Sequence, residues 1–169
     1  MKLKHVFKKG REVTTREGSF VIKLAKKIAS DIKQFCKKIE IGGSIRRKSK
    51  NPTDIDIILI PKNEGSKKEI EEVLSRKGKR VLGGEQKAYF KIDGVETEIY
   101  YTTPEEWGAA LMAYSSPFGA SIGLRVIARA KGFKLNQHGL FKHGKMVAGR
   151  TEEEIYKVLG RPWKPPEKR

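Results

Sequence analysis

Two carboxylates that follow a glycine-rich turn and two arginines are the part of this chain best suited to chemistry. Asp54 and Asp56 are two residues apart in a short apolar run, so in a strand both side chains point to the same face. Neighbouring acids in apolar surroundings repel each other unless a cation joins them, and a divalent metal suits that geometry. Upstream, Gly43–Arg47 (GSIRR) combines accessible backbone N–H groups with positive charge, which favours a phosphate. A metal beside a phosphate indicates phosphoryl or nucleotidyl transfer.

A third carboxylate for such a site is available further along the chain. The segment Val95–Thr102 reads as a strand in which Glu96 and Glu98 share one face. If this strand lies beside Asp54–Pro61, one of the two glutamates completes the metal site. The alternative is that both are solvated acids at the edge of a sheet.

The elements that must position these residues form a mixed α/β (α+β) pattern. Hydrophobic spacing and turn signals predict helices over 14–38, 66–77 (with Ser66 as its cap), 104–114, 116–131 and 151–160, and strands over 39–41, 54–61, 87–92, 95–102, 140–142 and 145–147. Asp93-Gly94 and His143-Gly144 are the expected hairpin turns, and 161–169, with three prolines, is expected to be extended.

Composition limits the class of protein and of partner. The 169 residues carry a net charge of +17, which favours a nucleic acid over a merely solubilising surface. Cys36 is the only cysteine, so no internal disulfide forms, and a buried structural thiol is the expected role. Without an apolar signal core or a membrane-length apolar run, the sequence predicts an intracellular protein that is neither secreted nor in a membrane.

The spacing from Gly43-Ser44 to Asp54-x-Asp56 resembles the signature of the polymerase-beta nucleotidyltransferase superfamily. Three further runs narrow the resemblance to the family X DNA polymerases, and they lie at 44–47, 131–141 and 151–167. The match extends over roughly residues 14 to 169. The resemblance implies a catalytic palm over 1–105, with a mixed β-sheet flanked by helices, and a small C-terminal nucleotide-selecting α+β subdomain over 106–169. A chain with only these two parts is a reduced form of the family, and it is similar to the small viral members.

The resemblance also implies an activity. It is template-directed DNA synthesis by two-metal nucleotidyl transfer, filling short gaps in repair, with deoxynucleoside triphosphates and gapped or template-primer DNA as partners. The cofactor would be two Mg²⁺ ions, with Mn²⁺ as an alternative, and the protein would act as a monomer. The implied catalytic and metal-binding residues are Asp54, Asp56 and Glu98.

Other roles follow from the same resemblance. The incoming nucleotide would be bound by Gly43, Ser44, Arg47, Tyr114, Ser115, Ser116 and Ser121. The DNA would be contacted by Arg125, from the minor-groove side, and by Arg129, Asn136 and His138. Arg16 or Arg11 is a weaker phosphate candidate.

The chain departs from the family pattern at two places. Glu98 stands where the family has aspartate, and this longer side chain alters the metal geometry. Residues 113–116 replace the usual Tyr-Phe-Thr-Gly pattern, so discrimination against ribonucleotides is left open. Two other functions therefore remain: a template-independent or non-DNA nucleotidyltransferase, and a non-catalytic nucleic-acid-binding protein on the same fold.

Overall fold

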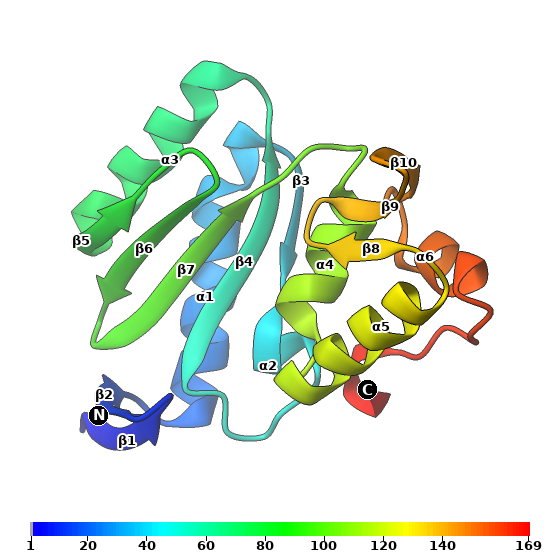
Figure 1. Cartoon of the computed structure of the whole chain (residues 1–169). Coiled ribbons are helices and arrows are strands. Elements are labelled where there is room, and N and C mark those ends of the chain that lie inside the picture. Colours follow the sequence, from blue (N-terminus) through cyan, green and yellow to red (C-terminus); the bar gives the residue numbers. More distant parts are fainter. Residues whose placement is uncertain (1) are drawn as a thin grey trace. The chain divides into compact units, whose positions relative to one another are not determined.

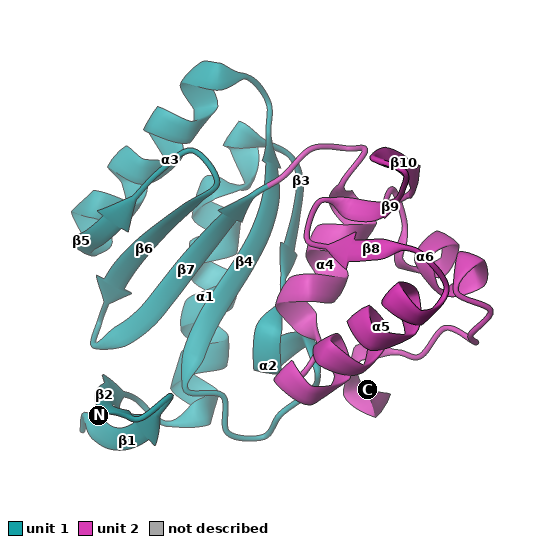
Figure 2. Cartoon of the chain, in the orientation of Figure 1, with its two compact units in different colours: residues 1–101 teal, residues 102–169 magenta. Residues whose placement is uncertain are grey.

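The computed structural model describes residues 2–169, which form two compact units, one ending at Tyr101 and the other running from Thr102 to Arg169 (Figures 1 and 2). The sequence placed the boundary after residue 105, four residues later than this division. No helix within 2–169 combines the length and the apolar character that crossing a bilayer requires.

The first unit is built on a five-stranded mixed sheet with the strand order β3-β4-β7-β6-β5. Only β4 and β7 are parallel, and the other neighbours are antiparallel. The elements of this unit are β1 (Lys4–Lys8), β2 (Arg11–Thr15), α1 (Gly18–Ile32), the 3₁₀ turn η1 (Lys33–Phe35), β3 (Cys36–Ile41), α2 (Gly43–Arg46), β4 (Asp54–Pro61), α3 (Glu64–Lys77), β5 (Gly78–Gly83), β6 (Lys87–Ile92) and β7 (Val95–Tyr101).

The core of this unit lies between one face of the sheet and the helices α1 and α3. Ile28 of α1 and Leu74 of α3 are fully buried against Ile57 and Ile99 of the two central strands. Burial of this apolar surface is what fixes the register, because a slip of one residue would turn the apolar side chains outward. The opposite face of the same strands carries the acids.

A basic hairpin, β1–β2, is attached to the sheet at the end where the acids lie. Its turn is Lys9-Gly10, with both residues at positive φ. Thr14 Oγ1 donates to the Gly94 carbonyl (3.3 Å) and Thr15 Oγ1 to the Thr53 carbonyl (2.6 Å), so β2 is tied to the β6–β7 turn and to the start of β4.

The second unit packs three helices around a three-stranded antiparallel sheet with the order β10-β9-β8. Its core combines Met112, Ala128, Leu140 and Ile155 from four different elements. The elements are α4 (Trp107–Ser115), α5 (Phe118–Ala130), β8 (Lys134–Asn136), β9 (Gly139–Lys142), β10 (Lys145–Ala148), α6 (Glu152–Val158) and the 3₁₀ turn η2 (Pro166–Lys168).

The end of the chain folds back on α6 instead of lying extended. Arg169 forms a buried ion pair with Glu152 (2.9 Å), with side chains only 2% and 4% exposed. The guanidinium also lies over the rings of Tyr156 and Trp163, at 5.6 and 6.0 Å from their centroids. The prediction of an extended basic tail over 161–169 was therefore wrong for its last residues, because this buried ion pair and η2 hold them.

The structure confirms the mixed α/β fold and corrects several elements. The first helix ends at Ile32, not near residue 38, because β3 begins at Cys36. Asn63, not Ser66, caps α3, with Ser66 three residues inside as the reciprocal partner of a capping box. Four strands were not predicted: β1, β2, β5 and β8. Cys36 is buried, as expected, and burial raises the pKa of its thiol to about 11.

Candidate active site and nucleic-acid interface

Parallel pairing of β4 with β7 brings the predicted carboxylates together. Asp54 lies opposite Glu96 and Asp56 opposite Glu98. Strand alternation turns the intervening Ile55 into the core, so the acids of both strands project from the other face of the sheet. A glutamate of β7 could complete the metal site only if β7 lay beside β4, and the two strands are neighbours.

Different partners distinguish the two glutamates. Glu96 accepts hydrogen bonds from the Tyr89 hydroxyl and from Arg11 Nη2 (3.1 Å). Glu98 instead shares the Tyr100 hydroxyl with Asp56, whose Oδ1 lies 3.4 Å from that oxygen. Glu98 therefore lies with Asp56, while Glu96 belongs to a separate cluster with Arg11.

The electrostatics of Asp56 record how closely the acids approach one another. Burial, followed by repulsion from Asp54 and from Glu98, raises the pKa of Asp56 to about 7, although Lys8 and the Tyr100 hydroxyl act in the opposite direction. The same repulsion between the acids would be relieved by a cation beside them. The chain supplies one cation itself, since the Lys8 ammonium group forms an ion pair with Asp54.

Lys8 and Tyr100 also affect the shape of the cluster. Within residues 2–169 no three His, Cys, Asp or Glu side chains are arranged as a preformed metal-binding group. The ammonium group is at Asp54, and the phenol hydroxyl lies between Glu98 and Asp56. Metal binding at this site therefore requires at least Lys8 to be displaced from Asp54.

The loop that precedes β4 fits a metal-bound phosphate. Gly43 has φ +56°, and a Cβ there would collide with Asp56 Oδ2, so only glycine lets the backbone approach this carboxylate so closely. The N–H of Gly42 donates to the Asp56 carbonyl (2.7 Å) and ties the loop to β4. Ser44 Oγ is buried without a hydrogen-bond partner in the described chain. With all-oxygen carboxylate donors beside it, the arrangement suits magnesium and a phosphate.

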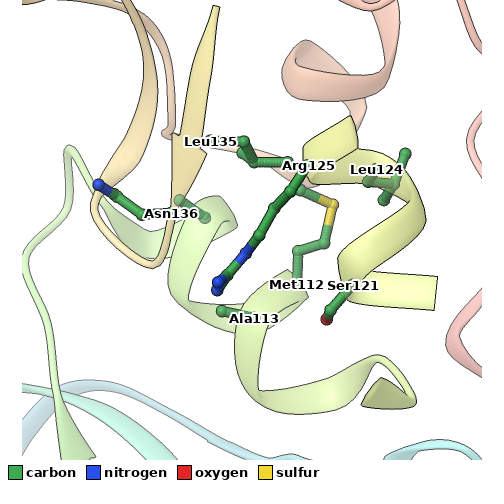
Figure 3. Close-up of a pocket in the computed structure, with 8 residues that line it drawn as sticks. Met112, Ala113, Ser121, Leu124, Arg125, Leu135 and Asn136 are labelled. Carbon is green, nitrogen blue, oxygen red and sulfur yellow. The ribbon is translucent and has the colours of Figure 1, made fainter. Parts of the chain in front are cut away.

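The candidate residues of the second unit lie around a small hollow between α4, α5 and β8. Ser121 and Arg125 of α5 and Asn136 of β8 line it, together with Ala113. In Figure 3 the Arg125 side chain reaches toward Ala113, and the amide of Asn136 points away from Arg125. The volume of about 10 Å³ suits one water molecule, so this hollow positions Arg125 and does not enclose a ligand.

The remaining candidates differ in accessibility. Ser115 is fully buried, whereas Tyr114 and Ser116 are partly exposed, and Ser116 Oγ accepts from Arg169 Nη1 (3.3 Å). His138 Nδ1 lies 3.1 Å from Glu106 Oε2. Among the predicted nucleotide- and DNA-binding residues, Arg125 and Arg129 are the exposed cations, and Arg47 is half-buried.

Three residues that contact the acids of β4 and β7 were missed from the sequence. Tyr100 is two residues after Glu98 in the same strand, so the period-2 rule would have placed its hydroxyl on the face of the acids. Tyr89 could have been found in the same way once β6 was paired with β7. Lys8 gave no such signal, because its segment showed no clear periodicity.

Comparison with known proteins shows the family of the chain. Residues 121–169 match the family model described as DNA polymerase beta thumb. Two proteins named Repair DNA polymerase X, from the Tick/Malawi and Badajoz isolates of African swine fever virus, are each 30% identical over 147 residues, covering 82% of this chain and 84% of theirs. DNA polymerase IV of Saccharomyces cerevisiae is 34% identical over 65 residues, covering 38% of this chain and 11% of the yeast protein.

The similarity to the viral proteins spans most of both chains. The thumb match covers residues 121–169, a segment that does not contain Asp54 or Asp56. The chain therefore belongs to the family X DNA polymerases.

Proposed function

We propose that this protein is a DNA-directed DNA polymerase that adds deoxynucleotides to a primer 3′-hydroxyl and fills short gaps in DNA repair. The observation that carries the proposal is the meeting of Asp54, Asp56 and Glu98 on adjacent parallel strands, with the Gly43-Ser44 backbone directly against Asp56. The names of the viral relatives and the thumb match support DNA as the substrate.

Asp54, Asp56 and Glu98 would hold two magnesium ions, or manganese ions, once Lys8 leaves Asp54. Bound there, the metals supply positive charge to the triphosphate and to the attacking oxygen. Ser44, through its unpaired hydroxyl, and Arg47 would bind the triphosphate. Glu98 would orient the primer 3′-hydroxyl and take its proton as O3′ attacks the α-phosphorus in line. A bond forms from O3′ to this phosphorus as the bond to the β-phosphate bridge oxygen breaks, and pyrophosphate leaves.

Unit 2 would supply contacts to DNA and to the nucleotide. Arg125 is an exposed cation held beside Ser121, which suits a contact with a base edge or a sugar in the minor groove. We expect the protein to act as a monomer. The substitution of glutamate for aspartate at residue 98 leaves the preferred metal to be measured with both Mg²⁺ and Mn²⁺.

Primer extension tests this function. The substrates are a one-nucleotide gap and an open template-primer with each templating base, supplied with deoxy- or ribonucleotides and with either metal. Asp56→Ala is expected to reduce synthesis to background while DNA affinity stays near that of the parent. Glu69→Ala, which removes an exposed acid of α3, is the matched control and is expected to retain parental synthesis.

Each outcome points to one function. Synthesis by Asp56→Ala near the parental rate would show that the metal site is misassigned. Addition that ignores the templating base would favour a template-independent transferase. DNA binding by the parent without any synthesis would favour a non-catalytic DNA-binding protein.

A further inference from the structure

A second, larger hollow in unit 2 is lined by aromatic and basic side chains that the proposed reaction does not use. It has a volume of about 490 Å³, within the range of about 300–1,000 Å³ that is usual for small-ligand sites. The aromatic–basic hollow, as we call it, is lined by two glycines and by Arg129, Phe133, Lys134, Asn136, Phe141 and His143. None of these lining residues is acidic.

The strand register places Phe141 on the open face of the small sheet. Phe141 pairs with Lys134 on one side and with Met146 on the other, while its neighbour Leu140 points into the core. Phe133 is less available, because the Lys142 ammonium group lies 5.4 Å from its ring centroid and its ring packs on the core. Phe141 is therefore the ring of this hollow that can receive a flat apolar ligand.

The charges around the hollow predict an anion. Arg129 and Lys134 are exposed, and no ion pair joins either to an acid within the described residues. Lys142 and Lys145 lie directly opposite each other on β9 and β10, an arrangement that destabilises a sheet unless a negative partner offsets it. The flat ring of Phe141 and the Arg129 and Lys134 cations that line the same hollow are chemistry that suits a nucleotide.

Asn136 connects this hollow to the residues proposed to contact DNA. It lines both the aromatic–basic hollow and the small hollow that holds Arg125. Arg125 and Arg129 are also four residues apart on α5, so they share one face of the helix. One strand of DNA that contacts Arg125 can continue to Arg129 along the same unit.

We propose that the aromatic–basic hollow binds an unpaired nucleotide of a DNA single strand, with its base on Phe141 and its phosphates on Arg129 and Lys134. A base inside a duplex has both faces covered by its neighbours, so only an unpaired base can place a face on this ring. Because the proposal rests on the proposed function for its choice of DNA, the strand expected there is the single-stranded template beyond the primer.

The test compares Phe141→Leu with the parent on three labelled DNAs: a blunt duplex, the same duplex with a 5′ template overhang, and oligothymidylate. Leucine keeps apolar volume in this half-buried position but has no aromatic face. We expect affinity for the overhang duplex and for oligothymidylate to fall about ten-fold, and affinity for the blunt duplex to stay near that of the parent. Phe141→Tyr is expected to bind like the parent. Lys134→Ala is expected to weaken binding of the overhang duplex. Its control is Lys79→Ala, which removes one exposed lysine from β5 of the first unit and is expected to leave that affinity unchanged.

The readouts separate this proposal from the proposed polymerase function. A 2-aminopurine in the overhang reports stacking directly, and its fluorescence is expected to change on binding the parent but not Phe141→Leu. Equal affinities of Phe141→Leu and the parent for the overhang would overturn the proposal, as would an equal loss on blunt and overhang duplexes. If the parent binds the overhang through Phe141 but synthesises nothing, the binding site stands and the polymerase function fails.

Discussion

At the scale of single residues, the acidic cluster is balanced by a cation from its own chain. Lys8 pairs with Asp54, and the two side chains are 32% and 21% exposed, so this ion pair is only partly screened by solvent. The same carboxylate is expected to bind a metal ion during synthesis. Lys8 and the metal therefore compete for Asp54, and their competition can be measured without any turnover.

Removal of Lys8 is expected to tighten metal binding. In Lys8→Ala, the carboxylate of Asp54 loses its internal partner, and repulsion from Asp56 then favours a divalent ion. We expect the dissociation constant for Mn²⁺, followed by electron paramagnetic resonance, to fall about three-fold, the size of a partly exposed ion pair. Lys4→Ala, on the same strand with its Glu17 partner 3.9 Å away, is the control and is expected to leave Mn²⁺ affinity unchanged. Unchanged or weaker Mn²⁺ binding by Lys8→Ala would show that Lys8 does not compete for the site.

At the scale of elements, the parts with strong local signals were predictable and the parts decided by pairing were not. Strand β4 begins and ends where its apolar run does, and Asp93-Gly94 forms the expected two-residue turn. Strand β5 is exposed, begins and ends with glycine, and exists because β6 lies beside it. Strand β8, three residues long, is too short for any period to show.

The same distinction applies to the candidate site. The two aspartates and Gly43 could be found from spacing alone, because they lie within one stretch of chain. Whether Glu96 or Glu98 completes the cluster depends on which side chains β6 and β2 bring to β7, and no local pattern contains that information. The family resemblance implied Glu98, and in the structure Glu96 is paired instead with Arg11 and Tyr89.

Helix α6 and the end of the chain are expected to depend on one buried ion pair. In Glu152→Ala, the Arg169 guanidinium is left buried without its carboxylate, and removal of one partner from such a pair lowers the free energy of unfolding by about 3–5 kcal/mol. Urea denaturation followed by circular dichroism measures this loss. The control, Glu153→Ala, removes the adjacent, exposed acid of the same first turn. It is expected to lower the free energy of unfolding by less than about 1 kcal/mol. Equal losses in the two variants would show that Arg169 contributes nothing to the stability of α6.

At the scale of the whole molecule, the positive charge exceeds what internal ion pairs with the acids can neutralise. The chain has 37 lysines and arginines against 20 acids. Lys23, Lys26 and Lys27 are exposed on α1, and Arg125 and Arg129 on α5, so both units carry cations on their surfaces. Contacts between these side chains and phosphates are insensitive to base sequence, and they give affinity through the release of counterions.

DNA affinity is therefore expected to fall steeply as salt rises. If six or more phosphates are contacted, the affinity for duplex DNA decreases by about 10³-fold between about 50 and 200 mM salt. Fluorescence anisotropy at several salt concentrations gives the slope, and a double variant of Lys26 and Lys27 to alanine is expected to make it shallower. Asp56→Ala is expected to keep the parental slope, because its carboxylate contacts no phosphate directly. A nearly flat slope for the parent would mean that the net charge of +17 serves solubility and that DNA is held by other contacts. In that case the affinity of this protein for DNA would have to come from few, specific contacts such as those expected of Arg125.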